Sequence, residues 1–194
     1  MSPQTPSRLI VAISGASGAI YGITALKMLN SLGVESHLVI SKAAALSLSA
    51  ETDRSLSEVN ALADQVYRVG DIGATIASGS FRTLGMLIAP CSIKTLSEIA
   101  TGVTSNLISR SGDVTLKERR RLVLMVRESP LHLGHLKTMA AVTEMGAIVA
   151  PPVPAFYTRP QTLQDMVAQS VGRALDLFGL EAPVQRWGGM NADD

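Results

Sequence analysis

The sequence predicts an α/β domain in which a mostly parallel sheet carries helices on both faces. Short apolar runs that end in glycine, serine or proline alternate with longer segments whose apolar residues recur at helical spacing. No internal repeat or linker interrupts this alternation, and 194 residues are enough for one domain with a sizeable core. The chain is therefore expected to form three layers, with the sheet in the middle.

The first unit is a buried strand that leads through a glycine-rich turn into a helix. Leu9–Ile13 is an apolar run rich in β-branched residues, and the turn after it reads Ser14-Gly-Ala-Ser-Gly18. Apolar residues then follow at helical spacing: Ile20, Ile23, Leu26, Leu29 and Leu32. Free N–H groups and the positive end of the helix dipole meet at such a turn, which predicts a nucleotide or flavin phosphate there. The alternative is an ordinary βα turn that binds nothing.

The type of nucleotide is indicated by what the turn lacks. It has the pattern G-x-x-G, whereas dinucleotide sites use G-x-G-x-x-G, and no P-loop pattern occurs in the sequence. The second expected strand, 34–41, ends in Ser41-Lys42, where an NAD site would carry Asp or Glu for the ribose. The hydroxyls of Ser14, Ser17 and Ser41 suit a mononucleotide phosphate instead.

The remaining elements are predicted by the same two patterns. Further strands are expected over 85–90, 121–126 and 147–150. Further helices are expected over 42–50, 56–67, from Cys91-Ser92 onward, around 106–120, over 132–145 and over 162–178. We expect residues 1–7 to be a short disordered lead, residues 8–180 to be the domain, and residues 181–194 to be a C-terminal tail that packs near the active site or a neighbouring subunit.

Polar residues gather where the expected strands end. They are Ser14 with Ser17, Ser41, Ser92, Arg127 with Glu128, and Tyr157. In an open parallel sheet, the crevice at the carboxyl ends of the strands is where ligands bind. The coincidence of five strand ends therefore predicts a ligand site more strongly than any single motif does.

Basic residues predict a second phosphate site. Arg110 and Lys117 are seven residues apart and share one helix face, and Lys117 with Arg127 and Arg173 could neutralise a phosphate. Glu128 is suited to proton transfer or to holding Arg127. Taken alone, a charge run such as Lys117-Glu-Arg-Arg-Arg121 is more often a solvated helix end.

Composition narrows the class of protein. A net charge of +1 favours neither nucleic acid nor an anionic membrane as a partner, and no apolar run approaches the ~20 residues of a membrane span. Charged residues make up 17%, against ~25% in an average domain, which predicts a large homo-oligomer, with a large monomeric core as the alternative.

The few cysteines and histidines favour a reduced, metal-free protein. A single cysteine, Cys91, fits a reducing cytoplasm and is expected to be a buried packing residue rather than a nucleophile. His132 and His135 share a helix face, but no third ligand is near them in the sequence, so no metal is expected. His37, inside a strand, is expected to be structural.

Eight motifs, in this order, resemble those of the UbiX-type (UbiX/Pad) flavin prenyltransferases, and the resemblance covers residues 8 to about 187. They are Ser14-Gly-Ala-Ser-Gly-Ala19, Ser41-Lys42, Glu51-Thr52, Ser78-Gly79-Ser80, Pro90-Cys-Ser-Ile-Lys-Thr-Leu96, Asp113-Val-Thr-Leu-Lys-Glu-Arg119, Val126-Arg-Glu128 and Pro151-Pro-Val-Pro-Ala-Phe-Tyr157. The resemblance implies a Rossmann-like or flavodoxin-like fold. It implies transfer of a dimethylallyl group from dimethylallyl phosphate to N5 and C6 of reduced FMN. The prenylated FMN would serve a UbiD-type decarboxylase, as in ubiquinone biosynthesis.

The same resemblance implies roles for individual residues and an assembly. FMN would be bound by Gly15, Ala16, Ser17, Ser41, Ser92, Ile93, Lys94, Thr95 and Arg127. The prenyl phosphate would be bound by Ser78, Gly79, Arg110, Lys117, Tyr157 and Arg173, with Trp187 near the site. Ser17, Glu128 and Lys117 would take part in catalysis. The family forms dodecamers with active sites at subunit interfaces.

The absence of an Asp-rich motif bears on the leaving group. The only adjacent aspartates are Asp193 and Asp194, so the sequence offers no motif of the kind that holds Mg²⁺ on a diphosphate. Arginine and lysine would have to balance the leaving-group charge, which suits a monophosphate.

Two alternatives remain open. Flavin-dependent decarboxylases of cysteine-containing peptides are similar at the first turn, but their later segment reads like Pro-Ala-Ser-Ala-Asn-Thr. Here it is Pro90-Cys-Ser-Ile-Lys-Thr95, with Lys94 in place of Asn, which counts against decarboxylation. A flavin carrier without chemistry would not need a second phosphate site.

Overall fold

The sheet is fully parallel and has six strands in the order β3-β2-β1-β4-β5-β6. A computed structural model describes residues 7–189 of the chain. The strands are β1 (Arg8–Ile13), β2 (Glu35–Ile40), β3 (Gln65–Tyr67), β4 (Gly85–Cys91), β5 (Arg121–Val126) and β6 (Ile148–Val149). This order reverses direction between β1 and β4, which is the switch point where doubly wound sheets bind ligands. The predicted fold class is confirmed.

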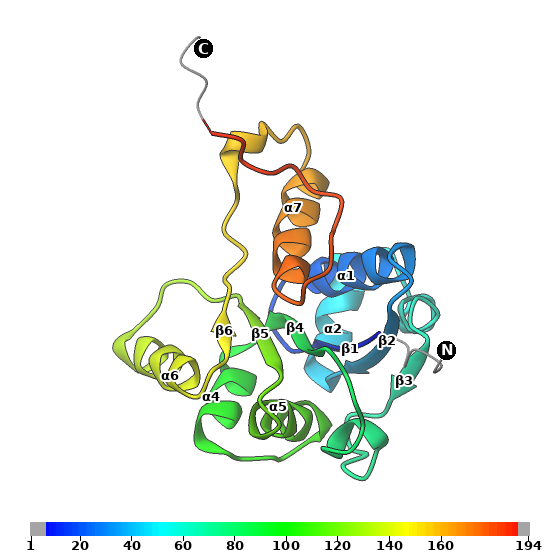
Figure 1. Ribbon diagram of the computed structural model, residues 1–194, viewed down its shortest axis with the longest axis vertical. Coiled ribbons are helices and arrows are strands. Elements are labelled where there is room, and N and C mark those ends of the chain that lie inside the picture. Colours follow the sequence, from blue (N-terminus) through cyan, green and yellow to red (C-terminus); the bar gives the residue numbers. More distant parts are fainter. Residues whose placement is uncertain (1–6, 190–194) are drawn as a thin grey trace, which may run out of the picture.

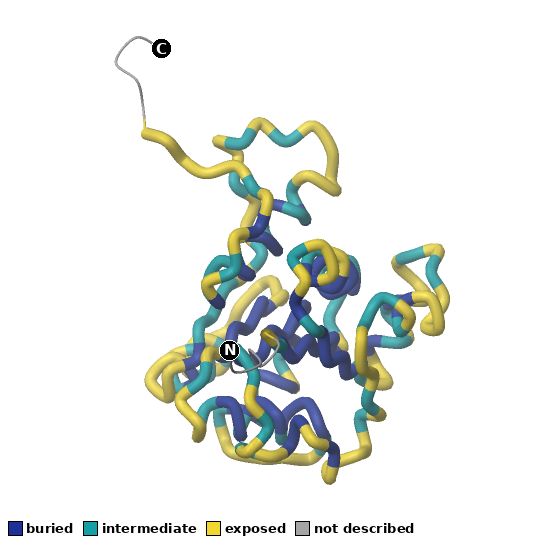
Figure 2. The backbone as a smooth tube through the Cα atoms, turned by 45° about the vertical axis from the view of Figure 1, so that its right-hand side comes forward, coloured by how far each residue is buried: buried dark blue, intermediate teal, exposed yellow. Residues whose placement is uncertain are grey.

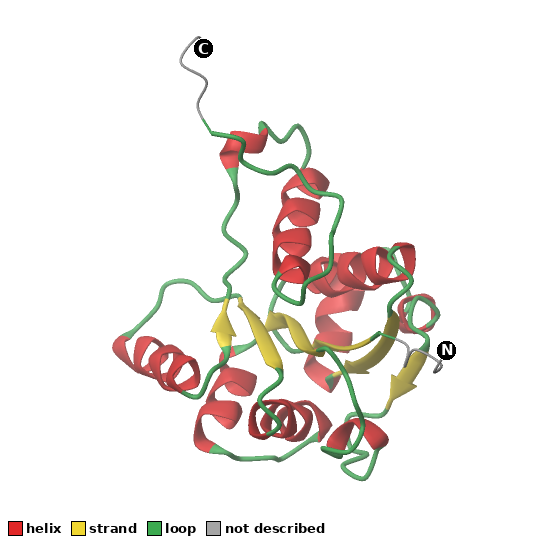
Figure 3. Cartoon of the chain, viewed as in Figure 1, coloured by secondary structure: helices red, strands yellow, loops and turns green. Residues whose placement is uncertain are grey.

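Helices cover both faces of the sheet (Figure 1). They are α1 (Ala19–Ser31), α2 (Lys42–Glu51), α3 (Leu56–Asn60), α4 (Ile93–Thr101), α5 (Leu107–Lys117), α6 (Leu133–Glu144) and α7 (Leu163–Asp176), with short 3₁₀ turns at η1 (Thr75–Ala77) and η2 (Phe156–Thr158). The helices α1 and α7 pack on one face, and α4 and α5 on the other. Figure 3 shows the loops that join them to the strands. No helix of the described residues is long and apolar enough to cross a membrane.

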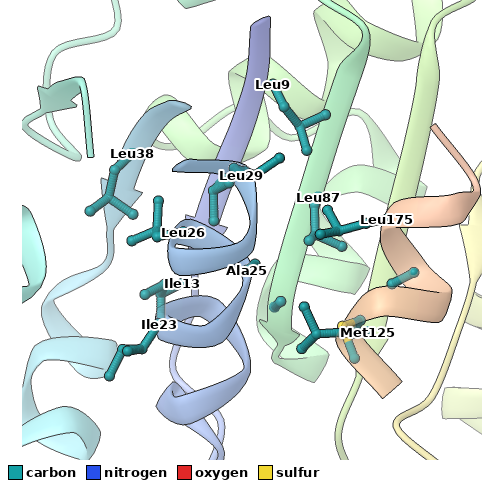
Figure 4. Close-up of a cluster of buried hydrophobic side chains, with 14 of the residues drawn as sticks. Leu9, Ile13, Ile23, Ala25, Leu26, Leu29, Leu38, Leu87, Met125 and Leu175 are labelled. Carbon is teal, nitrogen blue, oxygen red and sulfur yellow. The ribbon is translucent and has the colours of Figure 1, made fainter. Parts of the chain in front are cut away.

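Alternate residues of each central strand enter two separate cores. In β1, Leu9, Val11 and Ile13 belong to the core under α1 and α7, whereas Ile10 and Ala12 belong to the core over α4 and α5. Figure 4 shows the first core, where Ile23 and Leu26 of α1 lie over the sheet. Figure 2 shows the buried strands at the centre of the molecule, with exposed segments around them. The continuous apolar runs of the sequence follow from this burial on both faces.

One predicted element is wrong in part. The helix expected over 56–67 ends at Asn60, and Gln65–Tyr67 is instead an edge strand paired with β2. Asp64 fixes this turn, because its carboxylate accepts hydrogen bonds from the N–H and the hydroxyl of Ser36, at 2.8 and 2.9 Å. Pairing with β2 thus overrides the local helical pattern.

The close approach of α1 to the sheet depends on Gly22. A Cβ at this position would lie 2.5 Å from Cγ1 of Ile13 and 2.6 Å from the carbonyl oxygen of Ala89 in β4. Real Cβ atoms do not come this close, so any side chain at residue 22 forces α1 away from the strands.

We expect Gly22→Ala to lower the free energy of unfolding by about 1–3 kcal/mol, because overpacking against the β4 backbone outweighs the ~1 kcal/mol by which alanine favours a helix. Denaturant unfolding measures this change. The matched control is Gly73→Ala, since a Cβ at residue 73 meets only Oδ1 of Asp71, at 3.8 Å. If both variants unfold like the parent chain, α1 is not packed as described.

Candidate functional site

A cavity of about 730 Å³ lies at the carboxyl ends of the strands. Its lining comes from the segments that follow β1, β2, β3, β4 and β5: Gly15, Ala16, Ser17, Ser41, Lys42, Ala43, Val69, Gly70, Ser92, Ile93, Lys94, Thr95, Glu98, Ser105, Asn106, Ile108, Arg127 and Glu128. The structure therefore brings together four of the five polar strand ends predicted to form a site. Tyr157 is not among the lining residues.

A buried hydroxyl joins the two loops at the switch point. Ser14 is 1% exposed, and its Oγ donates to the carbonyl oxygen of Pro90 at 3.0 Å and accepts from the N–H of Ser92 at 2.7 Å. The N–H of Ser14 also donates to the carbonyl oxygen of Pro90, at 3.2 Å. The loop after β1 and the loop after β4 are thus held in one fixed relation on either side of the cavity.

Two helices begin at the cavity with capping serines. The side chain of Ser41 accepts from the N–H of Ala44 at 3.0 Å at the start of α2, and that of Ser92 accepts from the N–H of Thr95 at 3.3 Å at the start of α4. The first N–H groups of a helix have no partner within the helix, and the helix dipole places positive charge there. The α2 and α4 ends of the cavity can therefore bind an anion.

The start of α1, in contrast, already holds an anion of the chain itself. The Oε2 atom of Glu51, at the end of α2, accepts hydrogen bonds from the N–H groups of Gly18 at 2.7 Å and Ala19 at 3.3 Å. A phosphate at the start of α1 would meet this carboxylate. We therefore expect the phosphate at the N-termini of α2 and α4 instead. The motif Glu51-Thr52 was noted in the sequence, but no role was predicted for Glu51, because nothing in the motif indicates a contact with Gly18, 33 residues earlier.

The surroundings of Glu51 favour its ionised form. Burial alone would raise the pKa of its carboxyl, but hydrogen bonds from Gly18, Ser17 and Ala19 and the charge of Arg127 outweigh burial, so the pKa lies below its usual value. The carboxylate form of Glu51 is therefore favoured beside Ser17, which lines the cavity.

Arg127 and Glu128 both line the cavity and are exposed. The backbone N–H of Arg127 donates to the carbonyl oxygen of Cys91 at 3.2 Å, which fixes the end of β5 against β4. Oε1 of Glu128 accepts from the N–H of Ser129 at 3.0 Å. Lys117 and Arg173, which were expected to neutralise a phosphate together with Arg127, are not among the residues that line the cavity.

The residues expected to bind the prenyl phosphate form two other groups. In the first, Gly79 packs against the end of α5, where a Cβ at residue 79 would lie 2.9 Å from Nζ of Lys117. Lys117 pairs with Glu118 at 2.6 Å, and Arg110, also on α5, pairs with Asp113 at 3.1 Å. Ser78 adjoins Gly79, and its hydroxyl is 2.9 Å from that of Ser80.

The second group lies where the C-terminal segment meets α7. The rings of Tyr157 and Trp187 meet edge to face with centroids 5.5 Å apart, and Nε2 of Gln169 donates to Tyr157 at 3.2 Å. Arg173 pairs with Asp176, which also accepts from Arg186 at 2.7 and 2.8 Å. The tail expected over 181–194 is thus fastened to α7; residues 190–194, like 1–6, lie outside the described residues.

The single cysteine and the strand histidine have structural surroundings. Cys91 is fully buried, and burial raises the pKa of its thiol far above the usual value, as expected for a packing residue. Nδ1 of His37 is 2.9 Å from Tyr67 Oη, and Nε2 is 3.0 Å from Glu35. Residues 7–189 contain no group of three or more His, Cys, Asp or Glu side chains placed to hold a metal.

Comparisons with known proteins show the family of the chain. A family model described as "Flavoprotein" matches residues 2–172. The flavin prenyltransferase UbiX of Neisseria meningitidis serogroup B is 57% identical over 184 residues, which are 94% of this chain and 97% of that protein. The flavin prenyltransferase UbiX of Escherichia coli strain K12 is 58% identical over 186 residues, 94% of this chain and 98% of that protein.

Solved structures give the same result. The crystal structure of AnUbiX (PadA1) in complex with FMN and dimethylallyl pyrophosphate superposes with a TM-score of 0.95 at 50% identity, covering 96% of this chain and 100% of that chain. A dodecameric FMN-dependent UbiX-like decarboxylase from Escherichia coli O157:H7 superposes with a TM-score of 0.92 at 48% identity, covering 94% and 100%. The chain therefore belongs to the flavoprotein family, and within it to the flavin prenyltransferases of the UbiX type. The resemblance in sequence is confirmed.

We expect Ser14→Ala to weaken FMN binding about five- to 150-fold, because it leaves the buried N–H of Ser92 without its acceptor and frees the two loops, a loss of ~1–3 kcal/mol. Flavin fluorescence titration measures the affinity. The control is Ser36→Ala: Ser36 is 2% exposed, and its hydroxyl bonds Asp64 as both donor and acceptor. Equal loss of FMN in both variants would mean that general destabilisation, and not the loop connection, is responsible.

Proposed function

We propose that this chain transfers a dimethylallyl group from an allylic phosphate to N5 and C6 of reduced FMN. The observation that carries the proposal is the cavity at the switch point, in a chain half identical to a protein crystallised with both FMN and dimethylallyl pyrophosphate. The function needs a phosphate site, a surface for a flat ring and a route for a proton. The lining of the cavity offers each of them.

The residues of the cavity fit FMN. Its volume of about 730 Å³ lies within the usual ~300–1,000 Å³ of ligand pockets. Ser41, the segment 92–95 and Arg127 supply hydroxyls, N–H groups and a cation for a phosphate. Gly15–Ser17 also line the cavity, and Ile93 and Ile108 offer apolar surface. When bound, reduced FMN supplies the nucleophilic ring atoms. The chain holds the ring, and its apolar walls keep water from the allylic group.

Glu128 and Ser17 are the polar side chains of the cavity to which we assign proton handling. Glu128 lies in the lining without a cation paired to its carboxylate among the described residues, so it can take up a proton released on ring closure. Ser17, beside the ionised Glu51, can orient a donor or acceptor at the ring edge. Lys117 would balance the charge of the leaving phosphate.

The donor site requires more than one chain. In one chain, the groups around Lys117 and around Arg173 lie apart from the lining of the cavity. Exposed apolar residues such as Val153, Phe156 and Leu163, which are 73%, 71% and 77% exposed, favour burial against other copies. We therefore propose a homo-oligomer, a dodecamer as in the Escherichia coli O157:H7 relative, in which Ser78, Gly79, Arg110, Lys117, Tyr157, Arg173 and Trp187 complete the site at subunit contacts.

The product indicates the protein that uses it, and the single thiol indicates the compartment. Prenylated FMN would pass to a UbiD-type decarboxylase, with ubiquinone biosynthesis as the expected context. The buried single thiol fits a reducing compartment, so we propose the cytoplasm.

Mass spectrometry of the flavin tests the proposed function. We expect a flavin heavier by one dimethylallyl group after anaerobic incubation of the chain with FMN, a reductant and dimethylallyl phosphate. Parallel reactions with dimethylallyl pyrophosphate decide between monophosphate and diphosphate as donor. An unchanged flavin mass with both donors would refute prenyl transfer. In that case, loss of CO₂ from a cysteine-terminated peptide would identify the chain as a decarboxylase. If no CO₂ is released, the chain is a flavin carrier.

We expect Glu128→Gln to bind FMN with the parent affinity but to form the cyclised product at least ~100-fold more slowly, because the amide cannot exchange a proton. Anaerobic stopped-flow absorbance and the mass of the quenched flavin measure the two steps. If Glu128→Gln closes the ring at the parent rate at every pH, Glu128 does not transfer a proton and only positions cations.

A further inference from the structure

One arginine of the charge run Lys117–Arg121 is largely buried and hydrogen-bonded to the chain. Nη1 of Arg120 donates to the carbonyl oxygen of Phe81, and Nη2 donates to that of Gly79, both at 2.6 Å. The side chain of Arg120 is only 19% exposed. The adjacent Arg119 and Arg121 are exposed, and no side-chain hydrogen bond is found for either within residues 7–189. Among these three arginines of the described chain, Arg120 is therefore the one whose side chain is hydrogen-bonded.

The two hydrogen bonds hold a segment that has little support of its own. Residues 78–81 belong to no helix or strand, and the bonds within the segment are short-range ones, such as that from the N–H of Phe81 to the carbonyl oxygen of Ser78, at 3.2 Å. The ring of Phe81 contacts His37 and lies under Arg8, which holds one end of the segment. Arg120 holds its backbone. A planar guanidinium donates to the two carbonyl oxygens from two separate nitrogens held in one plane, whereas the three donors of a lysine ammonium share a single nitrogen.

This attachment sets the position of Gly79 relative to Lys117. Arg120 lies three residues after Lys117, the last residue of α5. Its hydrogen bond to the carbonyl oxygen of Gly79 therefore holds residues 78 and 79 against the end of that helix. The contact is close enough that a Cβ at residue 79 would lie 2.2 Å from Oε1 of Glu118 and 2.9 Å from Nζ of Lys117. The peptide and the ammonium of the proposed donor site are thus assembled by a third residue.

We propose that Arg120 is the positioning residue of the donor-phosphate site: it holds the segment 78–81 against Lys117 and does not itself contact the donor. The inference rests on the proposed function, because only that function assigns Ser78, Gly79 and Lys117 to the prenyl phosphate. Its rival is a field effect, in which Arg120 only adds positive charge that attracts a phosphate. The two explanations can be separated with Arg120→Lys, because this substitution keeps the positive charge but loses the planar pair of N–H donors.

The test compares Arg120→Lys with Arg120→Gln, and uses Arg121→Lys and Arg121→Gln as matched controls one residue away. Prenylation kinetics give KM for dimethylallyl phosphate and kcat, and titration gives the FMN affinity. We expect both Arg120 variants to raise the donor KM about tenfold with FMN affinity unchanged, since one or both charge-assisted hydrogen bonds are lost. The Arg121 variants should keep the parent KM. Hydrogen exchange of the amides of residues 78–82 should accelerate in the Arg120 variants alone.

Each other outcome overturns a definite statement. A parent-like KM in an active Arg120→Lys enzyme, or a rise of equal size in Arg121→Gln, would replace positioning by a field effect. Unchanged exchange at residues 78–82 would overturn the attachment itself. Absence of prenylated flavin with the parent chain would instead refute the proposed function, and the assigned role with it. Should the lysine variant fold poorly, recovery of the donor KM of Arg120→Ala by added guanidinium supplies a second measurement.

Discussion

The pair of hydrogen bonds made by the Ser14 hydroxyl is the constraint on which the site depends. A parallel sheet ends every strand at the same edge, but it does not by itself fix how neighbouring loops stand relative to each other. Because Ser14 donates to Pro90 and accepts from Ser92, the loops after β1 and β4 behave as one piece at the switch point. The start of α4, and with it the lining from Ser92 to Thr95, is set by this contact.

The electrostatics of the site depend on which side chain caps each of three helix N-termini. Three helix N-termini face the same edge of the sheet, and an anion in the cavity could in principle approach any of them. Glu51 occupies the start of α1, whereas Ser41 and Ser92 cap α2 and α4 with neutral hydroxyls. The carboxylate thus directs a phosphate away from the glycine-rich turn while leaving that turn as a close-fitting wall.

The sequence predicts the fold well because the fold rests on local patterns. β5 has the expected bounds, and β1 begins one residue early, since strands buried on both faces give unmistakable apolar runs. The cavity lining after β1, β2, β4 and β5 could also be predicted, because chain order alone brings strand ends to one edge. Contacts between distant segments could not be predicted, because no local pattern indicates them. Examples are the hydrogen bonds of Glu51 with Gly18, of Asp64 with Ser36, and of Arg120 with Gly79. The family resemblance named the remaining residues and implied active sites at subunit interfaces, but it did not say which of these residues lie outside the cavity of their own chain.

The separation of these residues into a cavity and two outlying groups has a genetic consequence. If the donor groups of one copy serve the cavity of another, a chain defective at Glu128 and a chain defective at Lys117 damage different halves of a shared centre. An assembly that contains both would still include some centres built from the two intact halves. Two individually inactive alleles would then complement each other in one cell, as alleles of an enzyme with a self-contained site cannot.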